Sequence, residues 1–234
     1  MSALTDEIRS RGHWSVRIHP ARFNPKRVAD YGSLRSIISR TAVRLRGWDF
    51  PHIGDFHDLK HGLDWIGQET DWQYYREAWR LYQTGQFAYL GAIHEDWAER
   101  ATHGWGPPAS LAEHGRLLGV GDTLFRFTEI FEFSARLALT EAGDDLMAVV
   151  IELKGLNDRS LWVDNPYRAP MDRWYTAHFD AFPYKSEVSR DRLSAEAREL
   201  AVTAARDLFE RFGWKPSPEL LRSQQAEGSR FASS

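Results

Sequence analysis

The chain has 234 residues with a formal net charge of −3; 42% of them are hydrophobic, 27% are charged and none is cysteine. This is the composition of a globular protein, and the lack of cysteine excludes a disulfide scaffold, thiolate metal sites and a cysteine nucleophile. No apolar run approaches the roughly 20 residues that cross a bilayer, and the first residues lack the basic and apolar regions of a signal peptide. We therefore expect a cytoplasmic protein with no membrane segment.

In the N-terminal half, alternating apolar residues predict strands, and Thr84-Gly85 predicts the turn of a hairpin. Ser33 is the expected N-cap of a short helix. In chain order we predict a flexible arm over 1–12, a strand over 13–19, a helix over 34–41, a strand over 43–46, an irregular segment over 51–62 and strands over 63–67, 78–83 and 86–94.

The C-terminal half contains the two longest predicted helices. Asp122 is the expected N-cap of the first, and the second ends at Gly213, with Trp214 placed to make the hydrophobic contact of a glycine C-cap. In chain order we predict a loop over 104–108, a helix over 122–139, strands over 147–154, 161–163 and 174–179, a helix over 192–212, a short helix over 215–225 and a disordered tail over 226–234.

The predicted strands follow one another in groups instead of alternating with helices. This order favours an α+β fold, mainly an antiparallel sheet packed by helices, over a doubly wound parallel sheet. We expect one domain over 13–214, with the Gly- and Pro-rich segment 104–108 as the alternative boundary.

Positive charge is concentrated near the N-terminus. Residues 1–48 carry a net charge of +7, because they hold ten Lys or Arg and three acidic residues; the rest of the chain carries −10. Only five of the 30 cationic residues are lysines, and the guanidinium of arginine suits carboxylates, phosphates and aromatic rings. The codons of a GC-rich genome also favour arginine, which is the alternative explanation of the arginine excess.

The alternation of the two N-terminal strands predicts where this charge is displayed. With Val16, Ile18, Val43 and Leu45 facing the core, residues of the opposite parity face solvent. An arginine-rich sheet face with an aromatic neighbour can hold phosphates and stack a base. Alternatively, these arginines pair with the acidic remainder of the same chain. The predicted binding residues are Arg17, His19, Arg44, Arg46 and Trp48.

Glu152 and Lys154 lie two residues apart near the end of an apolar strand, so their side chains share a face. In metal-dependent nucleases such a carboxylate binds magnesium while the lysine steadies the attacking water or the scissile phosphate. A second carboxylate is needed, but Asp145 would lie about 23 Å away along a continuous strand, and only Glu129 or Glu132 of the preceding helix could replace it. An ion pair at a solvated strand end explains the same pattern.

A histidine-rich segment is the second candidate for a metal site. His52, His57 and His61, interspersed with Asp55 and Asp58, are residue types that bind zinc and similar ions. Their spacing matches no established metal motif, and polar loop histidines are the alternative interpretation.

Five tryptophans fall within 41 residues, and three of them follow an aspartate. A buried indole with a turn-capping carboxylate would make these pairs structural. Exposed indoles would instead form a binding surface. The five are Trp65, Trp72, Trp79, Trp97 and Trp105.

Three segments, 14–20, 45–52 and 208–214, resemble a group of uncharacterised bacterial proteins. That group has no assigned activity, so the resemblance implies neither a function nor a site. Taken together, these features predict a non-enzymatic binding or accessory protein without a cofactor, whose basic N-terminal surface binds a protein or an anionic partner such as a nucleic acid or nucleotide. The alternative is a divergent metal-dependent nuclease or hydrolase that uses Glu152 and Lys154 with a divalent metal.

Overall fold

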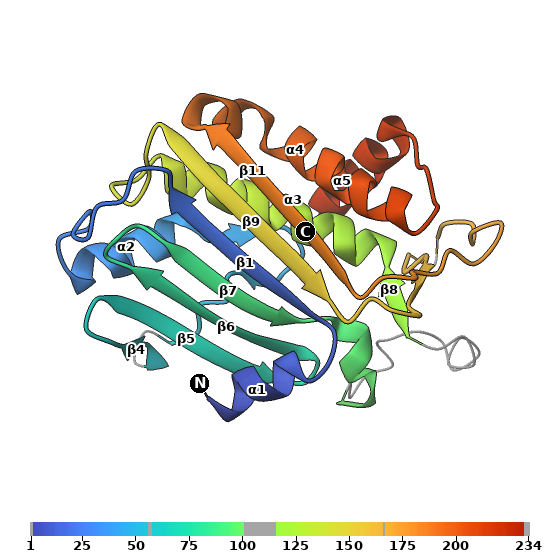
Figure 1. Ribbon diagram of the computed structural model, residues 1–234, viewed down its shortest axis with the longest axis horizontal. Coiled ribbons are helices and arrows are strands. Elements are labelled where there is room, and N and C mark those ends of the chain that lie inside the picture. Colours follow the sequence, from blue (N-terminus) through green and yellow to red (C-terminus); the bar gives the residue numbers. More distant parts are fainter. Residues whose placement is uncertain (1, 56–57, 101–115, 166, 232–234) are drawn as a thin grey trace.

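The computed structural model describes residues 2–55, 58–100, 116–165 and 167–231. Its centre is a seven-stranded sheet, with helices packed against one face and a short helix on the other (Figure 1). The elements are α1 (Ala3–Arg9), β1 (His13–Pro20), α2 (Tyr31–Thr41), β2 (Val43–Arg44), β3 (Asp49–Phe50), β4 (Lys60–His61), β5 (Trp65–Trp72), β6 (Tyr75–Tyr82), β7 (Phe87–Ala92), the 3-10 segment η2 (His94–Arg100), β8 (Leu117–Gly119), α3 (Val120–Ala138), β9 (Leu146–Lys154), β10 (Ser160–Trp162), β11 (Ala181–Ser189), α4 (Arg190–Arg211) and α5 (Pro218–Phe231).

The strand order in the large sheet is β11-β9-β1-β7-β6-β5-β4, and every neighbouring pair is antiparallel. Helices α2, α3 and α4 pack against one face of this sheet, and α5 packs on α3 and α4. The predicted α+β fold with a mainly antiparallel sheet and long C-terminal helices is therefore confirmed. None of the described helices is long and apolar enough to span a bilayer.

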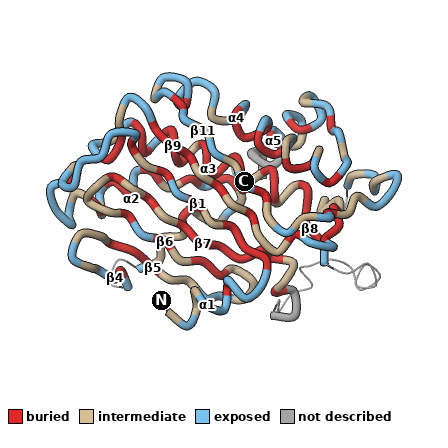
Figure 2. The backbone as a smooth tube through the Cα atoms, in the orientation of Figure 1, coloured by how far each residue is buried: buried red, intermediate tan, exposed pale blue. Residues whose placement is uncertain are grey.

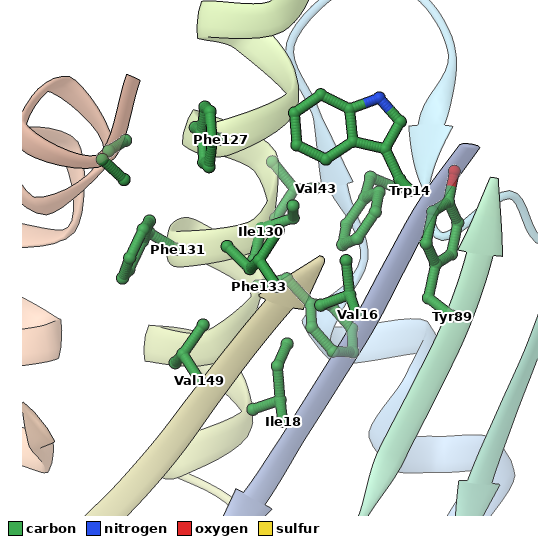
Figure 3. Packing of buried hydrophobic residues seen from close by; sticks show 14 of the residues in the cluster. Trp14, Val16, Ile18, Val43, Tyr89, Phe127, Ile130, Phe131, Phe133 and Val149 are labelled. Atoms are coloured by element: carbon green, nitrogen blue, oxygen red, sulfur yellow. The ribbon is translucent and has the colours of Figure 1, made fainter. Parts of the chain in front are cut away.

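Strand parity decides which side chains enter the core. On β1, Trp14, Val16 and Ile18 are buried against the helices, as alternation predicts. Trp14 meets Phe127 of α3 edge to face, with ring centroids 5.1 Å apart (Figure 3). Figure 2 shows buried positions along the strands and along the helices behind them. Phe131, on the same helix, is also fully buried, and its ring centroid lies 6.1 Å from that of Tyr184 on β11.

The N-terminal segment differs from the expected flexible arm. Residues 3–9 form α1, which lies on the face of the sheet opposite the other helices. Ile8 is fully buried there with Leu90 and Ala92 of β7, because these two residues have the outward parity on their strand. A small apolar cluster, which also includes Trp97, thus holds a segment that looks polar in the sequence.

Two predicted helix N-caps are wrong. Helix α3 begins at Val120, and its N–H groups at Gly121 and Asp122 donate to Asp164, at 2.8 and 2.7 Å. The cap therefore comes from a residue more than 40 positions away, which local sequence cannot indicate. Helix α2 begins at Tyr31, because the Asp30 carboxylate accepts a hydrogen bond from the Ser33 N–H at 2.8 Å.

Three further segments need correction. The segment 174–179 is no strand, because Thr176 makes only an isolated bridge to Ser160. The last helix runs to Phe231 instead of ending at 225, so most of the expected disordered tail is helical, and 232–234 lie outside the described residues. The short strand β4 falls within 51–62, a segment expected to be irregular. The loop over 104–108 also lies outside the described residues.

The predicted end of α4 is confirmed. Gly213 has a φ of +89°, a left-handed conformation that favours glycine. The Trp214 N–H donates to the Phe209 carbonyl at 3.0 Å, and the two rings lie 5.2 Å apart. The Thr84-Gly85 turn between β6 and β7 is likewise present, with Gly85 at a φ of +83°.

Candidate functional site

The outward face of the large sheet carries a row of alternating cationic and small residues. In the strand register, Arg17 of β1 pairs with Ala88 of β7, Ala88 with Arg80 of β6, Arg80 with Gly67 of β5, and Gly67 with Lys60 of β4. Consecutive cations are thus two strands apart, or about 10 Å at the usual strand spacing. The row crosses five strands, from the middle of the sheet to its β4 edge.

A groove of about 270 Å³ lies over this row. The small residues Gly67 and Ala88 form part of its base, and Thr5 and Arg9 of α1 form part of its border. Four cationic side chains and one carboxylate line the groove, a formal net charge of +3; they are Arg9, Arg17, Lys60, Arg80 and Glu69.

Two aromatic residues flank the cationic row. Trp65 of β5 pairs with Tyr82 of β6. This pair lies two residues along the strands from the pair Gly67 and Arg80, so it is on the same face, and both aromatic residues line the groove. The guanidinium carbon of Arg80 lies 4.3 Å from the centroid of the Trp65 ring. The groove therefore combines positive charge with partly exposed aromatic surface.

The row's cations differ in how they are neutralised within the chain. Lys60 contacts the Glu69 carboxylate at 2.9 Å. Arg17 and Arg80 are exposed, and neither has an acidic partner among the described residues. Their charge is available to a ligand without breaking an internal ion pair.

The structure does not bring the five predicted binding residues together. Arg17 and His19 lie on the outward face of β1, and His19 Nδ1 is within 2.9 Å of the Pro20 carbonyl oxygen. Arg44 is exposed on β2, which packs against α3 on the other side of the sheet. Arg46 and Trp48 follow β2. Arg46 contacts α3, and Trp48 contacts the end of the β5–β6 hairpin.

Arg46 is held inside a network of ion pairs. Its guanidinium donates two hydrogen bonds to the Glu129 carboxylate, at 3.0 and 2.9 Å, and a third to Asp122. Burial alone would raise the pKa of Asp122, but the charge of Arg46, together with the contacts of His94 and the charge of Arg126, outweighs burial and holds that pKa well below its usual range. A second buried arginine, Arg126, lies 3.4 Å from Glu129. Arg46 thus neutralises carboxylates of its own chain, as in the alternative interpretation of the N-terminal arginines.

Trp48 belongs to a stack of aromatic rings beside this network. Its ring lies parallel to that of His52 at 3.9 Å and to that of Tyr75 at 4.2 Å. Trp72, which is 51% exposed, stacks on Trp48 at 5.5 Å. A small cavity of about 70 Å³ lies between Trp48, Tyr75 and the charged network.

Two glutamates near this network have strongly shifted pKa values. Burial raises the pKa of Glu77 to about 7, although the charge of Arg126 opposes the shift. The Glu77 carboxylate accepts hydrogen bonds from the His52 N–H at 2.7 Å and the Tyr89 hydroxyl at 3.2 Å. Burial, followed by the charge of Asp122, likewise raises the pKa of Glu95 to about 7.

Glu152 and Lys154, the alternative catalytic pair, lie on the outward face of β9 and contact each other at 3.2 Å. Both are partly exposed there. Within the described part of the chain, no group of three or more His, Asp or Glu could hold a metal ion. The two side chains therefore form an ion pair on the strand, as the alternative interpretation expects.

The histidines of the other predicted metal site lie in different surroundings. His52 stacks on Trp48, and burial lowers its pKa. His61 is exposed on β4 and meets the ring of Tyr31 edge to face at 6.0 Å. His57 lies outside the described residues.

The aspartate–tryptophan pairs divide between the two interpretations. Trp97 is 1% exposed, and the Asp96 carboxylate accepts a hydrogen bond from the fully buried Arg159 at 2.7 Å, so this pair is structural. Trp72 of the pair Asp71-Trp72 is half-exposed. Trp105, which follows a glycine and belongs to no such pair, lies outside the described residues.

Local sequence patterns do not indicate most of the residues that line the groove. Arg80, Lys60 and Trp65 lie outside the N-terminal basic segment, and their outward orientation depends on the register of β4, β5 and β6. Two local signals indicate parts of it: the tryptophan cluster includes Trp65, and the alternation within β6 places Arg80 between the buried residues Trp79 and Leu81.

No family model, curated protein or solved structure is similar enough to this chain to count as a match.

Proposed function

We propose that this protein is a non-enzymatic binding protein that holds an anionic, phosphate-bearing partner in the groove on the outward face of its sheet. The observation that carries the proposal is the row Arg17–Ala88–Arg80–Gly67–Lys60, in which three cations are aligned across five strands. Cations gathered in a concave site above a low-dielectric core attract anions more strongly than isolated surface cations do.

Arginine at two of the three cationic positions supports a phosphate ligand. The guanidinium presents several donors in a planar fork that matches phosphate geometry. Since Arg17 and Arg80 have no carboxylate partner in the described structure, binding does not have to displace one. The buried carboxylates near Arg46 lie on the other side of the sheet and do not face the groove.

The test is a binding titration against salt with a fluorescent polyanion, using the wild type, the double variant Arg17→Ala/Arg80→Ala and the control Arg44→Ala. Arg44 is an exposed arginine outside the groove. We expect the double variant to weaken binding and to reduce the magnitude of the negative slope of log K against log salt by about 1.4 to 1.8, the contribution of two phosphate contacts. The control should bind like the wild type. Equal losses in the two variants, or no binding of the wild type at low salt, would contradict the proposal.

A further inference from the structure

We infer that the anionic partner is a single-stranded nucleic acid whose backbone crosses the strands along the row from Lys60 to Arg17. The inference rests on the proposed function and adds the class of polymer and its path. Three features of the groove carry it: the length of the cationic row, the aromatic pair beside the row, and the position of α1.

The length of the row favours a polymer over a mononucleotide. Arg17 and Lys60 are four strands apart, which is about 19 Å at the usual spacing, and Arg80 lies midway. The single phosphate of a nucleoside monophosphate cannot contact both ends of such a row. A flexible chain with a phosphate on every unit can contact all three cations at once, and each contact releases condensed counterions.

The aromatic pair favours a polymer that carries bases. Trp65 and Tyr82 stand side by side, one position away from the cationic row. Bases that project from a backbone lying on the row reach the parts of these two rings that Arg80 leaves exposed, where stacking is favourable for any base. A polyphosphate or an acidic peptide would contact the cations but has no ring to place on Trp65.

Helix α1 and the aromatic pair together favour a single strand over a duplex. In a duplex the bases are paired and stacked inside, so they cannot lie on Trp65. Thr5 and Arg9 of α1 border the groove above the plane of the sheet, and the ligand must fit beside them. A single strand can bend past α1 and present unpaired bases to Trp65 and Tyr82.

The experiment uses the full chain and four labelled or competing probes: a 12-nucleotide single strand, the same sequence as a duplex, polyphosphate of similar charge, and polyglutamate. The variants are Trp65→Ala, Trp65→Phe and the control Trp174→Ala, which removes a partly exposed indole outside the groove. Anisotropy measures binding, and circular dichroism checks that each variant is folded. We expect Trp65→Ala to weaken single-strand binding about 5- to 150-fold, the range for loss of one stacked base, and Trp65→Phe to restore much of it. Polyphosphate binding should change much less, because all three cations of the row remain.

The outcomes separate this inference from the proposed function. If polyphosphate binds as tightly as the single strand and Trp65→Ala changes neither, the protein binds anions but the inference is wrong. The inference is also wrong if the duplex binds as tightly as the single strand, or if polyglutamate binds more tightly than either. If none of the probes binds at low salt, the proposed function fails as well. A loss with Trp65→Ala that Trp65→Phe does not restore would contradict the stacking role of the ring.

Discussion

Arg17 and Arg80 flank the same residue, Ala88, from opposite sides of β7. The two arginines are 63 positions apart in the sequence, and neither has an acidic partner in the described structure. Ala88 lines the groove, and its methyl side chain fills little of the space between the two arginine positions. The relationship makes Ala88 the most direct position at which to test the groove.

Ala88→Glu should abolish most polyanion binding without harming the fold. The new carboxylate would lie next to two cations on neighbouring strands, and opposite charges across strands contribute about 0.2–1 kcal/mol each to stability. We expect thermal unfolding at an unchanged or higher temperature, together with a negative salt slope for binding whose magnitude is smaller by about 1 to 2. Ala88→Gln is the matched control and should retain the wild-type salt slope. If the two variants bind alike, bulk and not charge explains the effect.

Glu77→Gln should change the pH dependence of stability. Because burial raises the pKa of Glu77 from 4.5 to about 7, the folded state binds this proton more tightly than the unfolded state does. The resulting stabilisation is fully present below pH 4.5, is lost as the pH rises to about 7, and does not change further above that pH. The loss is on the order of 3 kcal/mol.

Urea unfolding at pH 5 and pH 8 measures this effect. Glutamine can still accept hydrogen bonds from the His52 N–H and the Tyr89 hydroxyl, so the variant should match the wild type at pH 5 and exceed it at pH 8. Both proteins keep a second contribution of the same sign from Glu95, which cancels in the difference between them. A constant difference between variant and wild type at both pH values would show that Glu77 does not titrate in this window.

Arg46→Met should strongly destabilise the fold. It would leave the carboxylates of Glu129 and Asp122 buried without their shared cation, and breaking a buried pair from one side costs about 3–5 kcal/mol. Adding Glu129→Gln should recover part of this loss, because one uncompensated charge is removed. The measurement is a double-mutant cycle of unfolding free energies. Strictly additive losses would mean that Arg46 and Glu129 do not interact energetically.

Ile8→Ala should release α1 from the sheet while leaving the rest of the fold intact. Ile8 is fully buried against Leu90 and Ala92, and removing its side chain costs about 2–5 kcal/mol of packing. Hydrogen exchange should therefore accelerate in residues 3–9 and stay unchanged in β9. Ala3→Ser, on the exposed side of the same helix, is the control. Faster exchange throughout the sheet would contradict a local effect.

Local patterns in the sequence were sufficient for several elements. The alternation of residues 13–19 predicted which side chains of β1 are buried, because neighbouring side chains on a strand always point to opposite faces. Gly213 and Trp214 predicted the end of α4, because a glycine C-cap involves only residues within one or two turns. The N-cap of α3 escaped prediction, since its carboxylate comes from Asp164.

The basic character of residues 1–48 is thus a property of the sequence, whereas the use of each arginine is decided by the tertiary structure. Arg17 and Arg46 have the same charge and similar neighbours in the chain. The sheet places Arg17 beside Arg80 in an open groove, and α3 places Glu129 and Asp122 against Arg46. The residues that line the groove are assembled by the pairing of β1 with β7 and of β4, β5 and β6 with one another. Strand register depends on contacts between distant segments, and a shift of one residue would turn each of these side chains to the other face.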